Sequence, residues 1–196
     1  MPRVIVNLSL SLDGVMQAPG RPDEDTRDGF VQGGWARPYF DPAMIPAEAD
    51  PAERPALLFG RRTYEDFFAV WPARAGNPFT ELLNQSRKYV ASTTLAEPLP
   101  WSRSTLLPGE AGAAVAALKA QPGPDLAVLG SGCLVRSLMA RGLVDEYVLS
   151  IHPLVLGAGR RLFPETGPFA PLRLVGTKTT ATGVVIATYR PAAAAE

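Results

Sequence analysis

Apolar residues recur along the chain at two spacings, and each spacing predicts a kind of element. In residues 125–159, an apolar run at 126–129 is followed by a glycine turn, by apolar residues at helical spacing and by a second apolar run at 147–156. This order predicts strand, turn, helix and strand, with Gly142 ending the helix. The unpaired backbone N–H groups at the start of such a helix favour an anion such as phosphate.

The same patterns recur through the rest of the chain. Tyr64, Phe67, Phe68 and Trp71 share one helical face, and Pro72 ends that helix. Further helices are predicted at 79–84 and 110–120, and strands at 3–12, 56–59, 88–91, 104–107, 172–180 and 184–189. Alternating strands and helices followed by a hairpin predict an α/β fold with a largely parallel sheet.

Residues 16–54 break this regularity, because prolines and charged residues leave room only for short helices. A segment of this length inside a domain is usually a functional loop or a lid. At 196 residues the chain is long enough for one domain. We expect a single domain at 1–191 and a frayed tail at 192–196.

Charge and composition exclude several classes of protein. The formal net charge is zero, without the global basic field of nucleic-acid binders, although residues 1–55 carry nine acidic and five basic side chains. The remainder is correspondingly basic. This asymmetry is either scatter or an indication that an anion site lies in the second part of the chain. One cysteine and one histidine cannot form a Cys/His zinc cluster. With no signal-peptide pattern and no bilayer-length apolar run, we expect a soluble cytoplasmic protein.

Polar or small residues follow three of the strands, where open α/β sheets bind ligands. These groups are Gly60-Arg61-Arg62-Thr63, Ser92-Thr93-Thr94 and Gly130-Ser131-Gly132. Two arginines at a helix start oppose the dipole, which makes sense if an anion lies between them and the helix. Alternatively they point outward and pair with Glu65 or Asp66. Thr63 with Asp66 resembles a capping box, so Thr63 is a ligand residue, an N-cap or both.

Several common motifs are missing. The glycine pairs at 130–132 and 157–159 lack the third glycine of the dinucleotide fingerprint, and there is no GxxxxGK[ST] loop and no GxSxG elbow. His152 precedes a proline inside an apolar strand, where a histidine is more often structural than catalytic. Cys133, in the first turn of a helix, is either a stabilised thiolate or a small packed residue.

Five segments in order nevertheless resemble one family. They are SLDG at 11–14, LLFGRRTYE at 57–65, KYVAST at 88–93, VLGSG at 128–132 and LVDEYVLSIHPLVLGAGRRLF at 143–163. Together they resemble the dihydrofolate reductase-like superfamily, in the branch of the C-terminal reductase domain of the bifunctional riboflavin-biosynthesis deaminase-reductase. The resemblance covers residues 3–190.

The resemblance implies a three-layer α/β fold, with a mixed, mostly parallel sheet flanked by helices, that binds NADPH and forms a homodimer. Arg61 and Arg62 would meet the 2′-phosphate side of the adenosine, and Thr63 the pyrophosphate. Gly60 is a further cofactor-binding residue that the resemblance implies. The others are Ser92 and Thr93 by the adenosine phosphate or adenine, Gly130, Ser131, Gly132, Cys133 and Leu134 around the pyrophosphate and toward the nicotinamide, and Ser9 and Leu10 against the nicotinamide ring.

The substrate side is less defined. Trp35 is either an aromatic wall for a flat ring or a packing anchor for its loop. Arg160 could contact an anionic substrate, by resemblance to the loop beside the substrate in the riboflavin branch. A proton donor would come from residues 23–41, with Tyr39 and Asp41 as candidates and water as the alternative. The zinc-dependent deaminase half is absent from this chain, which therefore supplies at most a reductase step.

These observations predict an NADPH-dependent reductase that transfers a hydride to a small heterocyclic, carbonyl or imine substrate. Two alternatives stay open. One is a module that binds NADPH or a flavin without turnover. The other is a structural or regulatory homodimer in which the glycine turns only pack.

Overall fold

The computed structural model describes residues 1–45, 54–74, 76–163, 165–166 and 169–192. The chain divides into two compact units. Unit 1 comprises Met1–Ile5 and Ala49–Val144, and unit 2 comprises Val6–Glu48 and Asp145–Glu196. The single domain at 1–191 stays a prediction. Of the expected tail, residues 193–196 lie outside the described part, as do residues 46–53 of the expected lid.

Unit 1 is built on parallel strands. These are β2 (Ala56–Gly60), β3 (Lys88–Ala91), β4 (Ser104–Leu107) and β5 (Leu126–Leu129). β2 pairs in parallel with both β3 and β5, and β3 pairs in parallel with β4. Four consecutive residues of β2 are buried, as expected of a central parallel strand that is covered on both faces. All four predicted strand positions in this unit are confirmed.

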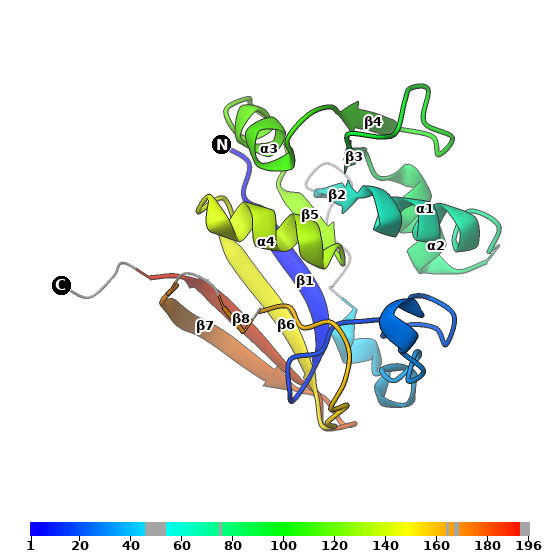
Figure 1. Ribbon diagram of the computed structural model, residues 1–196, viewed down its shortest axis with the longest axis vertical. Coiled ribbons are helices and arrows are strands. Elements are labelled where there is room, and N and C mark those ends of the chain that lie inside the picture. The colour runs from blue at the N-terminus through cyan, green and yellow to red at the C-terminus, as the bar shows by residue number, and fades with distance from the viewer. Residues whose placement is uncertain (46–53, 75, 164, 167–168, 193–196) are drawn as a thin grey trace. The chain divides into compact units, whose positions relative to one another are not determined.

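Helices α1 (Arg61–Val70) and α2 (Pro78–Gln85) cover one face of these strands (Figure 1). The core that they share with the strands consists of Leu57, Phe59, Tyr64, Leu83, Val90, Trp101 and Ala127. The side chains of Phe67, Phe68 and Trp71 pack against this core, which confirms the apolar face predicted for α1. Helices α3 (Ala111–Lys119) and α4 (Gly132–Ala140) pack against each other.

The predicted capping box at Thr63 is wrong. Helix α1 begins at Arg61, and Gly60 is its N-cap without a side-chain hydrogen bond. Thr63 is therefore the third helical residue, and both arginines lie inside the first turn. Strand β2 leads directly into the helix, so no room remains for the turn that the capping-box interpretation required.

Unit 2 contains β6 (Glu146–His152), β7 (Leu172–Thr179) and β8 (Val185–Pro191). β8 pairs antiparallel with both β6 and β7, and the predicted hairpin is confirmed. β6 ends four residues before the predicted boundary at 156. Pro153 has no N–H to continue a ladder, and the Leu154 N–H donates to the His152 carbonyl at 2.8 Å, which turns the chain.

In its described part up to residue 45, the long segment carries only short helices, as predicted. Three 3-10 helices lie at Arg27–Gly29, Arg37–Tyr39 and Pro42–Met44. The segment has a small core of its own, formed by Val15, Ala18, Phe30 and Trp35. The part of the segment between Ala18 and Trp35 therefore packs around a core.

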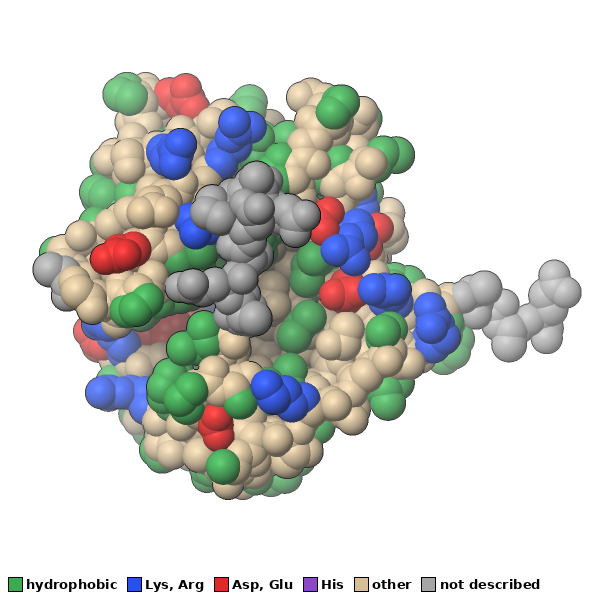
Figure 2. Space-filling view, turned by 180° about the vertical axis from the view of Figure 1, so that it is seen from behind, with side chains coloured by type: hydrophobic (Ala, Val, Ile, Leu, Met, Phe, Trp, Pro, Cys, Tyr) green, Lys and Arg blue, Asp and Glu red, His purple; other side chains and the backbone are tan. Residues whose placement is uncertain are grey.

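Strand β1 (Val4–Ser11) contributes residues to both units, and the strand order is β4-β3-β2-β5-β1-β6-β8-β7 (Figure 1). The mixed, mostly parallel sheet with an antiparallel C-terminal part confirms the predicted α/β class. Among the described residues, no helix has the length and hydropathy needed to cross a membrane. On the face drawn in Figure 2, basic and acidic side chains are interspersed.

Candidate functional site

Two strand-to-helix turns of unit 1 are fastened to each other through Ser131. The parallel pairing of β2 with β5 places Leu58 opposite Val128, so the two strands end side by side. Just beyond them, the Gly60 N–H donates to the Ser131 hydroxyl at 2.9 Å, and this hydroxyl donates to Thr63 Oγ1 at 2.7 Å. The segments Gly60 to Thr63 and Gly130 to Ser131, predicted to act together, are therefore in contact.

This contact explains why the turns consist of small residues. A Cβ on Gly130 would lie 3.2 Å from Thr63 Cγ2, and a Cβ on Gly60 would lie 3.2 Å from Ser131 Oγ. Gly130 also has φ of +84°, a region that favours glycine. Ser131 itself adopts left-handed geometry with φ of +64°. Two adjacent left-handed residues therefore turn the chain from β5 into α4.

The hydrogen bonds leave donors available at this position. The Ser131 hydroxyl gives its proton to Thr63, so the Thr63 hydroxyl keeps its own proton for another acceptor. Neither α1 nor α4 has a side-chain cap at its N-terminus. The first-turn N–H groups of both helices, and the positive ends of both dipoles, are features that bind anions such as phosphate groups.

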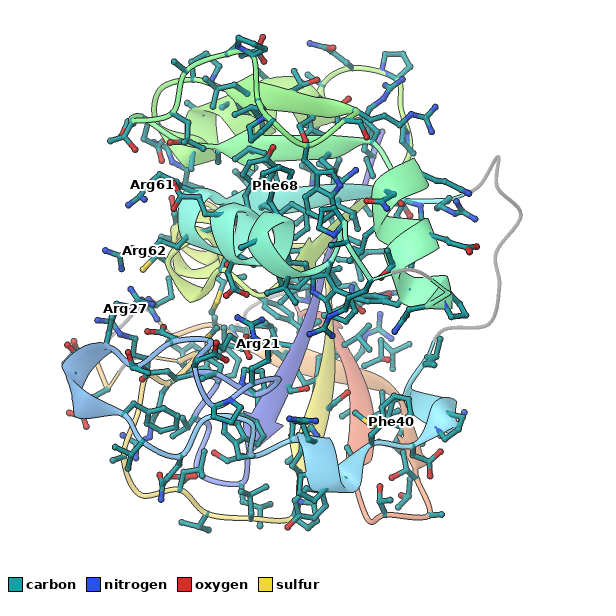
Figure 3. All side chains as sticks on the ribbon, turned by 90° about the vertical axis from the view of Figure 1, so that its right-hand side faces the viewer. Arg21, Arg27, Phe40, Arg61, Arg62 and Phe68 are labelled. Carbon is teal, nitrogen blue, oxygen red and sulfur yellow. The ribbon has the colours of Figure 1, made fainter. Side chains whose placement is uncertain are left out.

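Arg61 and Arg62 lie in the first turn of α1 and extend away from the helix (Figure 3). Arg61 Nη1 lies 2.8 Å from Glu65 Oε2. Arg61 therefore forms the ion pair with Glu65 that the sequence offered as the alternative to an anion site. Both side chains of this pair are more than a third exposed, and such surface pairs contribute only about 0–1 kcal/mol. Arg62 is exposed. An arriving anion could exchange with Glu65 at little cost.

The remaining unit 1 candidates differ in what they offer. Ser92 is buried, and its hydroxyl accepts hydrogen bonds from the N–H groups of Thr94 and Leu95 at 3.1 and 3.0 Å, so it shapes its own loop. Thr93 is exposed. In α4, Leu134 is buried, and the exposed Cys133 accepts a 3.3 Å hydrogen bond from Arg136. Contact of a pyrophosphate with the backbone at these two positions stays a prediction.

In unit 2, His152 links the predicted nicotinamide-facing strand to two aromatic rings. His152 is fully buried, and its Nδ1 lies 3.0 Å from the Ser150 carbonyl and 3.3 Å from the Leu10 carbonyl. The rings of Trp35 and Tyr39 meet its ring edge-on at 5.1 and 5.9 Å. Burial lowers the pKa of His152, so the neutral form is favoured. The role predicted for Ser9 and Leu10 stays a prediction.

Trp35, Tyr39 and Asp41 all hold their segment in place. Trp35 is 7% exposed and donates from Nε1 to the Gln17 carbonyl at 2.7 Å, which is the packing-anchor alternative. The two oxygens of Asp41 accept from the N–H groups of Ala43 and Ala181, and the Tyr39 carbonyl accepts from Thr182. Asp41 thus caps a 3-10 helix and bonds to the turn after β7. A catalytic role for Tyr39 and Asp41 stays a prediction.

Asp13 is a residue whose importance the sequence interpretation missed. Its carboxylate accepts from the Ser11 hydroxyl at 2.6 Å and from the N–H groups of Leu156 and Gly157 at 3.1 and 2.9 Å. The hydrogen bond from Ser11, with those from the two amides, lowers the pKa of Asp13 to about 2 against the effect of burial. The SLDG motif therefore holds the 156–161 loop, which carries Arg160.

Arg160 lies beside a pocket of about 360 Å³ within unit 2. Its Nη2 donates to Asp28 Oδ2 at 2.7 Å, and its backbone N–H donates to the Gln17 side chain at 2.9 Å. The prediction that this arginine could meet an anion is compatible with its place at the pocket, although in this structure its partner is Asp28.

The fold is that of the dihydrofolate reductase-like proteins. A putative riboflavin biosynthesis protein from Shewanella sp. PV-4 superposes with a TM-score of 0.71 at 22% identity, covering 97% of this chain and 99% of that one. Dihydrofolate reductase from Enterococcus faecalis, solved in complex with NADP(H) and RAB-propyl, superposes with a TM-score of 0.59 at 11% identity, covering 97% of each chain. These likenesses confirm the fold predicted from the motifs.

Within this class of reductase-like folds, sequence comparison defines the family. The model of the RibD C-terminal domain matches residues 2–186. The protein YyaP of Bacillus subtilis (strain 168), described as uncharacterized, is 31% identical over 193 residues, which is 95% of this chain and 94% of that protein. The chain belongs to the RibD C-terminal domain family, as its motifs indicated, and has the fold of the dihydrofolate reductase-like proteins.

Proposed function

We propose that the protein is an NADPH-dependent reductase whose unit 1 binds the phosphates of the cofactor. The observation that supports this most is the pair of helix N-termini fastened by Ser131. Uncapped N–H groups of α1 and α4 and the Thr63 hydroxyl would donate to the pyrophosphate. The cofactor supplies the hydride, while the protein supplies binding and orientation.

Arg61 and Arg62 would select the phosphorylated cofactor. The pyrophosphate needs only backbone donors, so the arginines are best explained by an additional phosphate, the 2′-phosphate that distinguishes NADPH from NADH. Arg61 would exchange its surface pair with Glu65 for this phosphate, and Arg62 is already exposed. Charge-assisted hydrogen bonds of this kind contribute about 1.5–3 kcal/mol each, which predicts a preference for NADPH of at least about ten-fold.

Calorimetry with NADPH and NADH tests this assignment. The wild-type protein should bind NADPH more tightly, and the double variant Arg61→Ala, Arg62→Ala should bind both cofactors alike. Arg87→Ala is the matched control, because it removes an exposed arginine of unit 1 that precedes β3 rather than α1. A double variant that keeps the full preference for NADPH would refute the 2′-phosphate assignment.

Turnover is a separate question, because both oxygens of Asp41 are already bonded to backbone N–H groups. Loss of reduced-nicotinamide absorbance, screened over pterins, pyrimidine amino-ketones and small carbonyl compounds, decides it. Oxidation of NADPH that depends on one of these compounds supports the reductase. Tight NADPH binding with no oxidation by any of them favours the alternative of a non-catalytic cofactor-binding module.

A homodimer is also part of the proposal, by family resemblance. Light scattering coupled to size-exclusion chromatography tests it directly. A mass close to twice the 20.9 kDa of one chain supports the dimer, and a mass of one chain at micromolar concentration contradicts it.

A further inference from the structure

The pocket of about 360 Å³ in unit 2 is lined by two tight turns of the backbone. One turn contains Asp28, with φ of +58°, and the other contains Gly159, with φ of +117°. A Cβ on Gly159 would lie 2.7 Å from Val15 Cγ1 and 2.8 Å from Phe30 Cε2, so this loop needs glycine to close against its neighbours. The volume of the pocket is in the range of small-molecule sites.

Arg160 presents a half-occupied hydrogen-bonding edge at this pocket. Its Nη2 donates to Asp28 at 2.7 Å, while its Nε is buried and has no hydrogen-bond partner among the described residues. Nε and Nη2 together form one fork of the guanidinium, which matches the two oxygens of a single anion. Asp28 satisfies only one of these two donors. Because its side chain is 70% exposed, the pair is readily exchanged.

The neighbouring charges indicate which anion fits. Arg27 also lines the pocket, but its guanidinium is already bonded to both oxygens of Asp25. Of the two arginines that line the pocket, Arg160 therefore has the partner that is more easily displaced. One guanidinium suits a single negative charge better than a phosphate dianion. Phe30 and Leu156 add apolar walls beside it. The chemistry is that of a carboxylate attached to a small apolar body.

We propose that this pocket binds a small organic carboxylate, one of whose oxygens replaces Asp28 on Nη2 of Arg160 while the other accepts a hydrogen bond from Nε. Asp28 occupies part of the anion position in the free protein and is displaced by the ligand. This inference concerns unit 2 alone and does not rest on the cofactor assignment, so the two can fail independently.

Titration of the cofactor-free protein with benzoate, followed by amide NMR, tests the proposal. Benzoate should shift the Gly159 and Arg160 amides saturably, and neutral benzamide and inorganic phosphate should each bind at least about ten-fold more weakly. Arg160→Gln should weaken benzoate binding by at least about ten-fold, and Arg160→Lys, which keeps the charge but loses the fork, should weaken it as well. Asp28→Asn should tighten binding by up to about five-fold, because the competing carboxylate is removed.

The matched control is Arg190→Gln, which removes an arginine paired with Glu146 at 2.7 Å in the same unit and outside the pocket. It should leave benzoate binding unchanged. No saturable shift up to about 20 mM benzoate in both the wild type and Asp28→Asn would overturn the proposal. Equal binding by a folded Arg160→Gln variant would overturn it too, and phosphate binding as tight as benzoate would overturn the choice of a carboxylate.

Discussion

Replacing Ser131 with alanine removes the side chain that fastens two turns of unit 1. The variant loses a 2.9 Å bond from the Gly60 N–H and a 2.7 Å bond to Thr63. Each neutral bond contributes about 0.5–1.5 kcal/mol, and a buried N–H left without a partner costs about 1–3 kcal/mol. Gly60 is partly buried, so water can replace some of the loss. We therefore expect the free energy of unfolding to fall by about 2 kcal/mol.

Urea denaturation followed by far-UV circular dichroism measures this loss. With a slope of about 2 kcal/mol per M, the midpoint should fall by about 1 M. Ser137→Ala is the control, because Ser137 lies on the same helix and its hydroxyl makes only an exposed 3.3 Å bond to Glu110. That variant should change stability by less than about 0.5 kcal/mol. Equal midpoints for the two variants would refute the fastening role of Ser131.

Three further predictions concern burial and backbone strain. Burial lowers the pKa of His152 below 6.5, so the unfolded chain binds the proton first and stability should fall as pH drops below about 6.5. In His152→Gln, the melting temperature should depend less on pH between pH 7 and 5.5 than in the wild type. An unchanged pH dependence would contradict this. Burial lowers the pKa of Lys88 to about 8, so the unfolded chain binds this proton more tightly than the folded protein does. Between pH 8 and 10.5 the free energy of unfolding of the wild type, measured by urea denaturation, should therefore rise by up to about 3 kcal/mol relative to Lys88→Met. Parallel pH dependence of the two proteins would count against this. Gly159→Ala should lower the free energy of unfolding by about 2–4 kcal/mol, because its Cβ would clash with neighbouring side chains and its φ is strained. Gly157→Ala, with φ of +75° and open space for a Cβ, should lower it by only about 1 kcal/mol. Similar losses in thermal melts of the two variants would disprove the clash.

The elements of the fold could be predicted from the sequence because, over most of the chain, the spacing of apolar residues and the positions of glycine and proline indicate the same helices and strands. Three separate features of the sequence predict where β5 ends and α4 begins. They are the apolar run of β5, the glycine turn after it and the apolar face of α4. Two local predictions were wrong. The capping box at Thr63 is wrong because the Thr-x-x-Asp pattern does not reveal that β2 continues to Gly60 and that the helix begins at Arg61. The end of β6 was missed because hydrophobicity continues past Pro153 after the hydrogen bonds stop.

The candidate site was only partly predictable. The turns at Gly60 and Gly130 could be expected to lie close together, because each follows a strand of a parallel sheet and such strands end at one edge. The link through Ser131 could not be foreseen, because it joins residues 71 positions apart in the sequence. In the sequence, Asp13 stands out only as part of the SLDG motif, whereas in the structure its carboxylate accepts hydrogen bonds from the amides of Leu156 and Gly157. Such roles depend on tertiary contacts that no local pattern encodes.

We propose above that the paired N-termini of α1 and α4 bind the pyrophosphate of a nicotinamide dinucleotide. Amide NMR during titration with NADPH tests it most directly, because an amide that donates to a phosphate changes its chemical shift strongly. We expect saturable shifts that are largest at Thr63, Gly132, Cys133 and Leu134, and smaller shifts in the Ser131→Ala variant. Saturable binding with these four amides unmoved, or no binding, would contradict it.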